Sequence, residues 1–330
     1  MAKLFSGIQP TGDLHLGNYF GAITNWVDLQ KEHDTVYCVV DLHAITSDYE
    51  PKNLRDNSVE QAMDLMACGI DPDESILFVQ SEVTEHVELQ WIFNSVTSYG
   101  DLTRMTQFKD KSEDRDFVSA GLFDYPVLQA ADILLYKASK VPVGEDQIQH
   151  VELTRRIARK FNSRFGEFFP EPEPIVGKAA RIMSTADPEK KMSKSAHDKH
   201  AIGLMENEDS IWEKVKTAVT DPGQSEGEAM SPGVANLFTL LELTAPESTV
   251  ESFRDDHREG NLMYIDLKEA VYENLMSEIR PVQEKKQELL NNRDQVKEIL
   301  EEGSEKAREI AARNMKKVRE LVGINPSHFS

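Results

Sequence analysis

The sequence predicts an α/β protein with a doubly wound parallel sheet, followed by an all-helical C-terminal region. Two observations carry this prediction. Over the first half of the chain, short runs typical of strands alternate with helical patterns, as βαβ units require. Beyond about residue 206 the pattern becomes almost purely helical. Ligands of such sheets bind beyond the carboxyl ends of the strands, where the strand order reverses, so a site is expected at that edge.

The first half of the sequence predicts strands and helices in alternation. Strands are expected at Lys3–Ile8, Thr35–Val40, Ile76–Gln80 and Val141–Val143. Helices are expected at Gly17–Glu32, Pro51–Cys68, Glu85–Tyr99 and Phe123–Lys137, and from the last strand to about Arg164. Gly69 stands where a helix terminator belongs, and Pro170–Pro174 is a proline-rich break.

The sequence beyond about residue 206 predicts a series of helices. They are expected at Ser210–Val219, Val234–Leu243, Ser248–Glu259, Met263–Met276, Pro281–Glu302 and Ser304–Val322. We therefore place one domain over residues 1–205 and a helical domain over residues 206–330. The last two helices are long and adjoin Gly303, which predicts an antiparallel pair.

The composition is that of a globular protein. Hydrophobic residues make up 39% and charged residues 29% of the 330 residues. No apolar run reaches the ~18 residues that span a bilayer, and the N-terminus lacks the apolar core of a signal peptide, so a cytoplasmic location without a membrane partner is expected. The two cysteines, Cys38 and Cys68, cannot supply a Cys₄ zinc or iron–sulfur site.

The charge is strongly negative but unevenly spread. The formal net charge is −21, whereas Lys306–Arg319 holds six basic residues against Glu309 alone, a net of +5. Such a row of cations on an acidic chain would steer a polyanion to one region. The alternative is a solvated helix face, or one paired with the acidic residues Glu298, Glu301, Glu302 and Glu305.

A glycine-rich turn follows the first strand and opens a helix. It runs from Gly7 to Asn18, with the order Gly-Ile-Gln-Pro-Thr-Gly-Asp-Leu-His-Leu-Gly-Asn. Asp13 and Leu14 stand where a Walker P-loop needs Lys and Ser or Thr, so a P-loop is excluded. The small residues let a phosphate or adenine approach the backbone, and the helix N-terminus favours negative charge. His15 could donate hydrogen bonds to a phosphate as charge develops. An ordinary strand–helix turn is the alternative.

A second motif, Lys190–Ser195, combines three lysines and two serines in the order Lys-Lys-Met-Ser-Lys-Ser. A loop of this kind can place ammonium groups on a triphosphate. Attack at the α-phosphate drives charge onto the departing pyrophosphate, which positioned lysines stabilise. A solvated basic loop is the alternative, although it does not predict this order of residues.

Together the two motifs carry a resemblance. His15–Asn18 resembles the HIGH signature, and Lys191–Ser195 spells the KMSKS signature, of class I aminoacyl-tRNA synthetases with a Rossmann-like catalytic domain. Four further segments resemble the tryptophanyl-tRNA synthetase family, and this similarity extends over nearly the whole chain. They are Phe5–Gly12, Met105–Lys111, Ala130–Tyr136 and Val143–Gln147.

The resemblance implies an enzyme that activates L-tryptophan with ATP and passes it to tRNA(Trp). It implies a homodimer with dimerisation elements in the catalytic domain, a helical anticodon-binding domain at 206–330, and Mg²⁺ held by the ATP phosphates without a metal site of the protein's own. The catalytic residues would be His15, Lys111, Lys191 and Lys194. ATP would bind Gln9, Pro10, Thr11, Gly17, Asn18, Gly144, Glu145, Asp146, Ile182, Lys191, Met192, Ser193, Lys194 and Ser195. Tryptophan would bind Phe5, Gly7, Gln9, His43, Tyr125, Gln129, Asp132, Val141, Val143 and Gln147.

Asp132 also has a chemical argument of its own. It interrupts the apolar helical stretch 130–135, where an unpaired buried carboxylate would be costly. Indole offers one donor and no acceptor, so a selective pocket needs one acceptor among apolar walls. The alternative is a structural salt bridge. His43 could border the same pocket or be structural, whereas His86 and His150 lie in helical patterns that need no functional account.

The nearest rival is the tyrosyl-tRNA synthetase family, which shares the fold and both signatures. Tyr125, Gln129 and Asp132 fit its spacing as well, and Gln129 departs from the Met of many bacterial tryptophan enzymes. Phe5 favours tryptophan, because it cannot hydrogen-bond a phenol hydroxyl, and Gln9 replaces an acid of the tyrosyl family. A non-enzymatic tRNA-binding relative and a small-molecule nucleotidyltransferase are further alternatives. The intact His15 and lysines, and the long helical region, argue against them.

Overall fold

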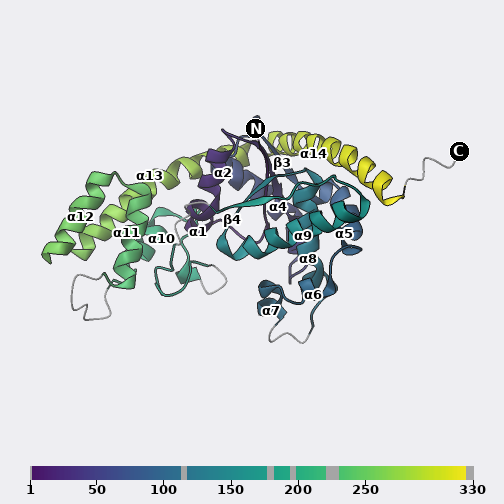
Figure 1. Cartoon of the computed structure of the whole chain (residues 1–330). Coiled ribbons are helices and arrows are strands. Elements are labelled where there is room, and N and C mark those ends of the chain that lie inside the picture. Colours follow the sequence, from purple (N-terminus) through teal and green to yellow (C-terminus); the bar gives the residue numbers. More distant parts are fainter. Residues whose placement is uncertain (1, 113–116, 177–181, 194–197, 221–229, 325–330) are drawn as a thin grey trace.

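The computed structural model describes residues 2–112, 117–176, 182–193, 198–220 and 230–324. Its sheet has five parallel strands in the order β3-β2-β1-β4-β5 (Figure 1). The strands are β1 (Lys3–Ile8), β2 (Asp34–Val39), β3 (Ser75–Val79), β4 (Lys140–Val143) and β5 (Glu173–Val176). The doubly wound prediction is confirmed, and the order reverses between β1 and β4.

Strand β5 replaces the break that was expected at Pro170–Pro174. Val141 of β4 pairs with Pro174 of β5. A proline cannot donate to a ladder, but β5 lies at the edge of the sheet, where a strand needs hydrogen bonds on one side only. The prolines therefore mark an edge strand here.

The helices of the first half follow the predicted order with shifted ends. They are α1 (Leu16–Asn18), the π-helix η1 (Tyr19–Ile23), α2 (Thr24–Leu29), α3 (Asp41–Ala44), α4 (Pro51–Ala67), α5 (Glu85–Asn94), α6 (Tyr99–Leu102), α7 (Thr106–Ser112), α8 (Ala120–Leu135) and α9 (Ile148–Phe165). The helix expected over Glu85–Tyr99 ends at Asn94. Helix α8 begins before Phe123, because Ser119 caps it by accepting a hydrogen bond from the Leu122 N–H at 3.0 Å.

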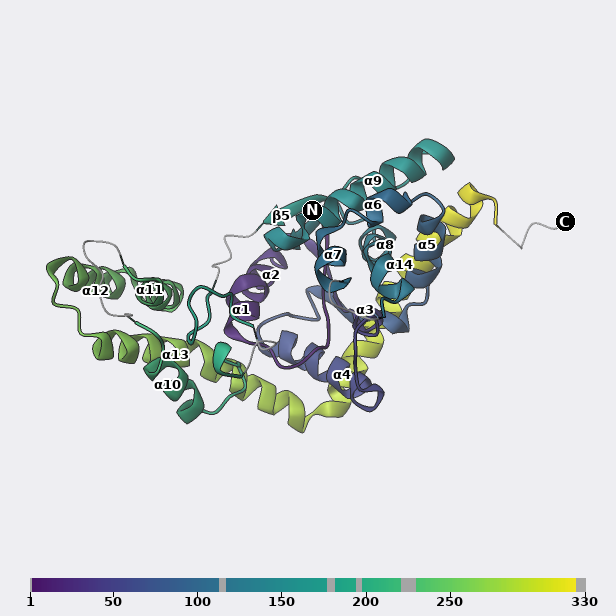
Figure 2. The ribbon, with the colours of Figure 1, turned by 90° about the horizontal axis from the view of Figure 1, so that it is seen from below.

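The helical region contains α10 (Glu208–Lys216), α11 (Pro232–Thr244), α12 (Glu247–Glu259), α13 (Tyr264–Asn291) and α14 (Arg293–Val322). The breaks expected at Pro281 and Gly303 were wrong, since α13 continues through Pro281 and α14 through Gly303. The chain turns at Asn292 instead. Figure 2 shows α13 and α14 meeting at an elbow there, so the expected antiparallel pair was also wrong.

Gly303 lets α14 lie close against the sheet. A Cβ at this position would stand 1.9 Å from the Leu77 carbonyl oxygen of β3, so only glycine fits without a shift. β3 is an edge strand, and covering an edge with a helix protects its open hydrogen-bonding groups. Farther along α14, Asn314 Nδ2 donates to the Leu135 carbonyl of α8 at 2.7 Å. The helical region therefore ends against the sheet, while α10–α13 project away from it (Figure 1).

We predict that Gly303→Ala lowers the free energy of unfolding by about 1–3 kcal/mol, the usual cost of overpacking. Alanine has the higher helix propensity, so a gain would be expected if Gly303 were an ordinary helical residue. Denaturant unfolding measures the change. Gly121→Ala on α8 is the matched control, because its Cβ would meet atoms no closer than 3.5 Å. Equal effects of the two variants would contradict the close approach of α14 to β3.

Candidate active site

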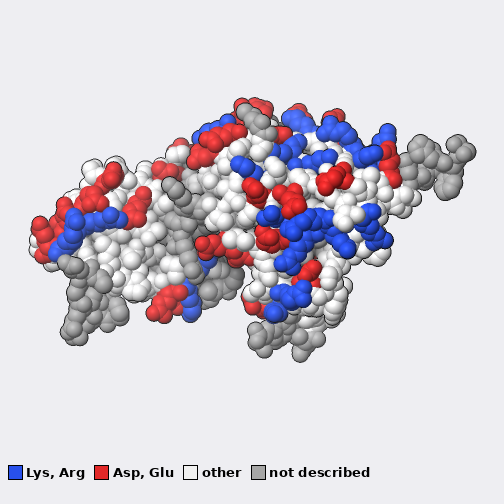
Figure 3. Space-filling model, viewed as in Figure 1, with Lys and Arg blue, Asp and Glu red and all other residues white. Residues whose placement is uncertain are grey.

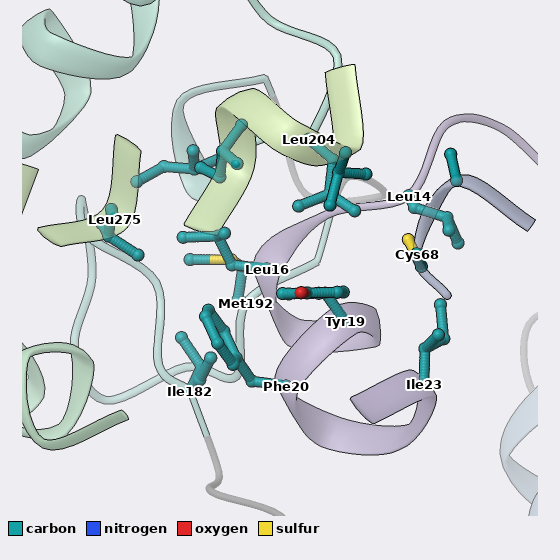
Figure 4. Close-up of a cluster of buried hydrophobic side chains, with 14 of the residues drawn as sticks. Leu14, Leu16, Tyr19, Phe20, Ile23, Cys68, Ile182, Met192, Leu204 and Leu275 are labelled. Atoms are coloured by element: carbon teal, nitrogen blue, oxygen red, sulfur yellow. The ribbon is translucent and has the colours of Figure 1, made fainter. Parts of the chain in front are cut away.

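The two signature motifs lie side by side in the structure. The Met192 side chain is buried, and a Cβ on Gly17 would stand 3.7 Å from the Met192 Cβ. Met192 N–H donates to the Ile182 carbonyl at 3.0 Å, and both side chains join Leu16 in one hydrophobic cluster (Figure 4). Apolar packing thus holds the start of the KMSKS motif against the HIGH-type turn.

His15 occupies the N-cap of α1 in a reciprocal capping arrangement. The His15 backbone N–H donates to Asn18 Oδ1 at 3.1 Å, and the His15 side chain faces the backbone N–H of Asn18. A Cβ on Gly17 would stand 2.9 Å from the imidazole of His15. Gly17 and Asn18 therefore have a local role, which is to seat the histidine ring. The π-helix that follows is a feature often found at functional sites.

A cavity of about 360 Å³ opens beside this turn, at the point where the strand order reverses. Residues of β1 and β4 form one wall, and α8 supplies another. Every residue expected to bind tryptophan lines it: Phe5, Gly7, Gln9, His43, Tyr125, Gln129, Asp132, Val141, Val143 and Gln147. The lining also includes Asn25, Trp26 and Gln107, which sequence reasoning had not assigned.

Asp132 is the buried charge of this cavity, with 1% of its surface exposed. Its Oδ1 accepts hydrogen bonds from His86 Nδ1 at 2.6 Å and Gln80 Nε2 at 2.7 Å. Its Oδ2 accepts from His43 Nε2 at 2.8 Å. Burial raises the pKa of the Asp132 carboxyl, but the hydrogen bonds and attraction of His43 and His86 outweigh burial and hold the pKa at about 2. Asp132 is therefore an ionised acceptor at neutral pH.

This network changes the interpretation of two histidines. His43 does border the cavity and also pairs with Asp132. His86 was expected to need no functional account; in the structure it is fully buried and pairs with the same carboxylate. The sequence carried no signal for His86 or Gln80, since both reach Asp132 from positions far away in the chain.

A chain of polar side chains forms the other end of the cavity. The Tyr125 hydroxyl lies 3.1 Å from Gln107 Oε1 and 2.9 Å from His150 Nε2. Gln107 and Gln147 each donate to Asp146 Oδ2, at 3.1 and 2.8 Å. Burial raises the pKa of Tyr125 to about 12, so it stays a phenol at neutral pH. Asp146 was expected to accept from ribose hydroxyls, and here it accepts from two amides.

Gln129 joins this polar end rather than the apolar walls. Its Nε2 lies 3.5 Å from Gln147 Oε1, at the limit of a hydrogen bond. Gln107 stands within the segment Met105–Lys111 that carried part of the resemblance, but its residue type alone gave no role. The contact with Tyr125 is what identifies it as a cavity residue.

The remaining residues expected around ATP are distributed along the same edge. Gly144 lines the cavity, Glu145 and Asp146 lie in the short 3₁₀ helix Glu145–Gln147, and Ile182 is buried beside Met192. Pro10 is buried, Thr11 and Lys191 are exposed, and Ser193 is half-buried. Lys111 lies in α7. Lys194 and Ser195 lie outside the described residues.

Among the described residues, no three His, Cys, Asp or Glu side chains converge as ligands for a metal ion. In the same part of the chain, none of the helices has the length and apolar character needed to cross a membrane.

A comparison with models of protein families assigns the family. The family model described as tRNA synthetases class I (W and Y) matches residues 1–280. The chain therefore belongs to the class I aminoacyl-tRNA synthetases for tryptophan and tyrosine.

Relatives and solved structures narrow this class further. The chain is 47% identical to a tryptophan–tRNA ligase of Helicobacter pylori and 44% identical to one of Caldanaerobacter subterraneus, with at least 98% of each chain covered. It resembles the tryptophanyl-tRNA synthetase of Campylobacter jejuni, solved with ADP and tryptophan, with a TM-score of 0.86, 37% identity, and coverage of 97% of this chain and 99% of that one. The chain belongs to the tryptophan–tRNA ligases, which confirms the sequence interpretation.

Proposed function

We propose that this chain activates L-tryptophan with ATP, forms tryptophanyl-adenylate and pyrophosphate, and transfers tryptophan to the 3′ end of tRNA(Trp). The observation that carries the proposal is the cavity around Asp132. It pairs an ionised, buried acceptor with the apolar side chains of Phe5, Val141 and Val143, beside the two signature motifs.

The hydrogen bonds of Asp132 support indole as the ligand. A carboxylate accepts about four hydrogen bonds, and three protein donors already use Asp132. Two of those donors fall on Oδ1 and one on Oδ2, which leaves room for a further donor at Oδ2. Indole has a single N–H and no acceptor, so it matches a wall with one acceptor. The structural pairing and the ligand role of Asp132 are therefore compatible.

The polar end of the cavity suits the ammonium and carboxylate groups of the free amino acid. Tyr125, Gln147 and Gln9 line the cavity near the HIGH-type turn, where we propose that they orient the ammonium and carboxylate. The carboxylate oxygen attacks the α-phosphate of ATP, the bond to pyrophosphate breaks, and charge builds on the leaving group. His15, Lys111, Lys191 and Lys194 would stabilise that charge. The remaining predicted ATP residues, from Pro10 to Ser195, would position the nucleotide.

Magnesium would enter with ATP, with its phosphates as the principal ligands. Bound there, the ion neutralises phosphate charge and stabilises the departing pyrophosphate. The cytoplasmic location stays a proposal.

An ATP–pyrophosphate exchange assay with each amino acid in turn tests the proposal. We predict strong dependence on tryptophan, with tyrosine lower by about 10–100-fold in kcat/KM, because a buried phenol hydroxyl would lack a partner at Phe5. The Tyr136 hydroxyl cannot substitute, since Tyr136 is buried and does not line the cavity. A dominant tyrosine signal would overturn the proposed specificity.

A homodimer is supported by an exposed apolar surface on the catalytic part. Large side chains gather there with high exposed fractions, including Trp91 at 78%, Tyr99 at 75% and Phe117 at 79%. Tyr99 contacts Phe123 of α8 with ring centroids 5.3 Å apart, and Gln90, next to Trp91, bonds the adjacent Asp124 at 2.7 Å. Helices α5 and α6, which carry Trp91 and Tyr99, therefore both contact α8. A second copy of the chain would cover these exposed aromatic side chains, as expected of exposed apolar surface.

We predict that Trp91→Glu weakens the dimer by about 30-fold or more, the usual effect of removing an aromatic interface anchor. Sedimentation analysis at several protein concentrations measures the change. Met263→Glu is the control, because Met263 is 60% exposed and lies at the start of α13, away from this surface. A variant Trp91→Glu that sediments like the wild type would exclude this surface as the interface.

Some basic side chains of α14 are bonded to other protein groups, whereas others face the solvent. Arg319 pairs with Glu88 of α5, Arg308 donates to the Glu82 carbonyl, and Lys317 pairs with Glu320. The acidic partners expected at 298–305 turned out to lie on α14 itself, so they do not form an adjoining helix. Arg313 and Lys316 are exposed, and Figure 3 shows basic side chains over α14. We propose that these two contact tRNA.

Replacing Arg313 and Lys316 by glutamine should weaken tRNA binding and leave adenylate formation unchanged. The slope of log affinity against log salt should flatten by roughly 0.7–0.9 per lost phosphate contact. Lys285→Gln with Lys297→Gln removes the same charge from residues paired with Glu288 and Asp294, and serves as the control. Equal tRNA affinity of the two double variants at matched salt would leave α14 without this role.

A further inference from the structure

We infer that His86 and Tyr136 are positioning residues for tryptophan recognition, acting on the indole through Asp132 without touching it. This inference rests on the proposed function, because it explains how the Asp132 carboxylate presents its remaining acceptor to the cavity. Neither residue lines the cavity, whereas Asp132 does.

The two residues form a directed chain of hydrogen bonds. A carboxylate at neutral pH only accepts, so His86 Nδ1 donates to Asp132 Oδ1 across 2.6 Å. The Tyr136 hydroxyl lies 2.8 Å from His86 Nε2. In a neutral imidazole whose Nδ1 carries the proton, Nε2 is an acceptor, so the Tyr136 hydroxyl donates to it. Burial raises the pKa of Tyr136 well above its ordinary value, so the hydroxyl has a proton to donate. The hydroxyl thereby fixes the tautomer that points an N–H at Asp132.

Aromatic packing fixes the chain in place. His86 has no exposed surface and Tyr136 has 1%. The His86 ring stacks on Phe78 at a centroid distance of 5.9 Å, and Tyr136 stacks on Phe5 at 5.6 Å with 5° between the planes. Since Phe5 lines the cavity, Tyr136 supports both the apolar wall and the chain of hydrogen bonds that ends at the acceptor.

The donors are divided unequally between the two oxygens of Asp132, and this division explains how His86 and Tyr136 could position the acceptor. His86 and Gln80 both bind Oδ1, while His43 alone binds Oδ2. Two donors on one oxygen hold the carboxylate plane against rotation about the side chain. They also direct the remaining acceptor capacity to Oδ2. Without His86, Oδ1 would regain an acceptor site and could compete for the substrate's N–H or for water.

The test compares tryptophan with its benzothiophene analogue, in which sulfur replaces the indole N–H. Amino-acid-dependent ATP–pyrophosphate exchange gives kcat/KM for each, and their ratio measures what the N–H contributes. The variants are His86→Leu, which removes both ring nitrogens, and Tyr136→Phe, which removes one hydroxyl. His86→Asn keeps a short amide donor near the Nδ1 position and tests rescue. Thr35→Val is the control, since it deletes a buried hydroxyl that lies 2.8 Å from Ser75 Oγ, and neither residue lines the cavity.

We expect the ratio to fall about tenfold in His86→Leu and about threefold in Tyr136→Phe, in keeping with the loss of one buried hydrogen bond to a charged group. His86→Asn should restore part of it, Thr35→Val should preserve it, and KM for ATP should stay the same. Should His86→Leu not fold, Tyr136→Phe still carries the test.

Equal losses for both amino acids would mean that His86 and Tyr136 serve folding alone, and would overturn the inference while leaving the proposed function intact. A wild-type enzyme that uses tryptophan but does not distinguish it from the analogue would remove the indole contact of Asp132, and the positioning role with it. A wild-type enzyme without tryptophan-dependent exchange would overturn the proposed function itself.

Discussion

The organisation of the site depends on the burial of one carboxylate. Moving an ionised carboxylate out of water costs far more than a single hydrogen bond returns, so Asp132 requires several donors at once. Those donors come from α3, from the end of β3 and from α5, while Asp132 itself lies on α8. Satisfying the charge therefore draws elements from both sides of the switch point into one geometry. The same network that stabilises the charge also shapes the cavity wall.

The second constraint is the apolar packing that holds the KMSKS motif in place. Met192 and Ile182 are buried in the cluster that includes Leu16, Phe20 and, from α13, Leu275 (Figure 4). Lys191 is exposed, whereas its neighbour Met192 is anchored in a core shared by the HIGH-type turn and the helical region. This anchor holds Lys191 close to the HIGH-type turn. The charged residues thus depend on a neighbouring apolar one for their placement.

Much of this arrangement could be predicted from the sequence, but for different reasons. The strands β1 to β4 followed from short strand-like runs in the local sequence, whereas β5 did not, because Pro174 indicates an edge strand only when its neighbour is known. Gly303 was expected to end a helix, since local propensity cannot show the Leu77 carbonyl that requires a glycine. The cavity residues were named through resemblance. Gln107 and His86 were missed because their partners, Tyr125 and Asp132, are distant in sequence.

The path of the C-terminal helices gives the helical region a defined position. Lys286 of α13 donates to Asp64 Oδ1 of α4 at 2.6 Å and to the Glu60 carbonyl at 2.8 Å, with both charged side chains nearly buried. Burial raises the pKa of Asp64, an effect that Lys286 opposes, so the pair is a specific contact rather than a general source of stability. Beyond the elbow at Asn292, Gly303 fixes α14 on β3. Because one contact precedes the elbow and the other follows it, α13 is held in direction as well as in place. A projecting region held in this way keeps a fixed distance from the cavity, which a flexible tether could not do.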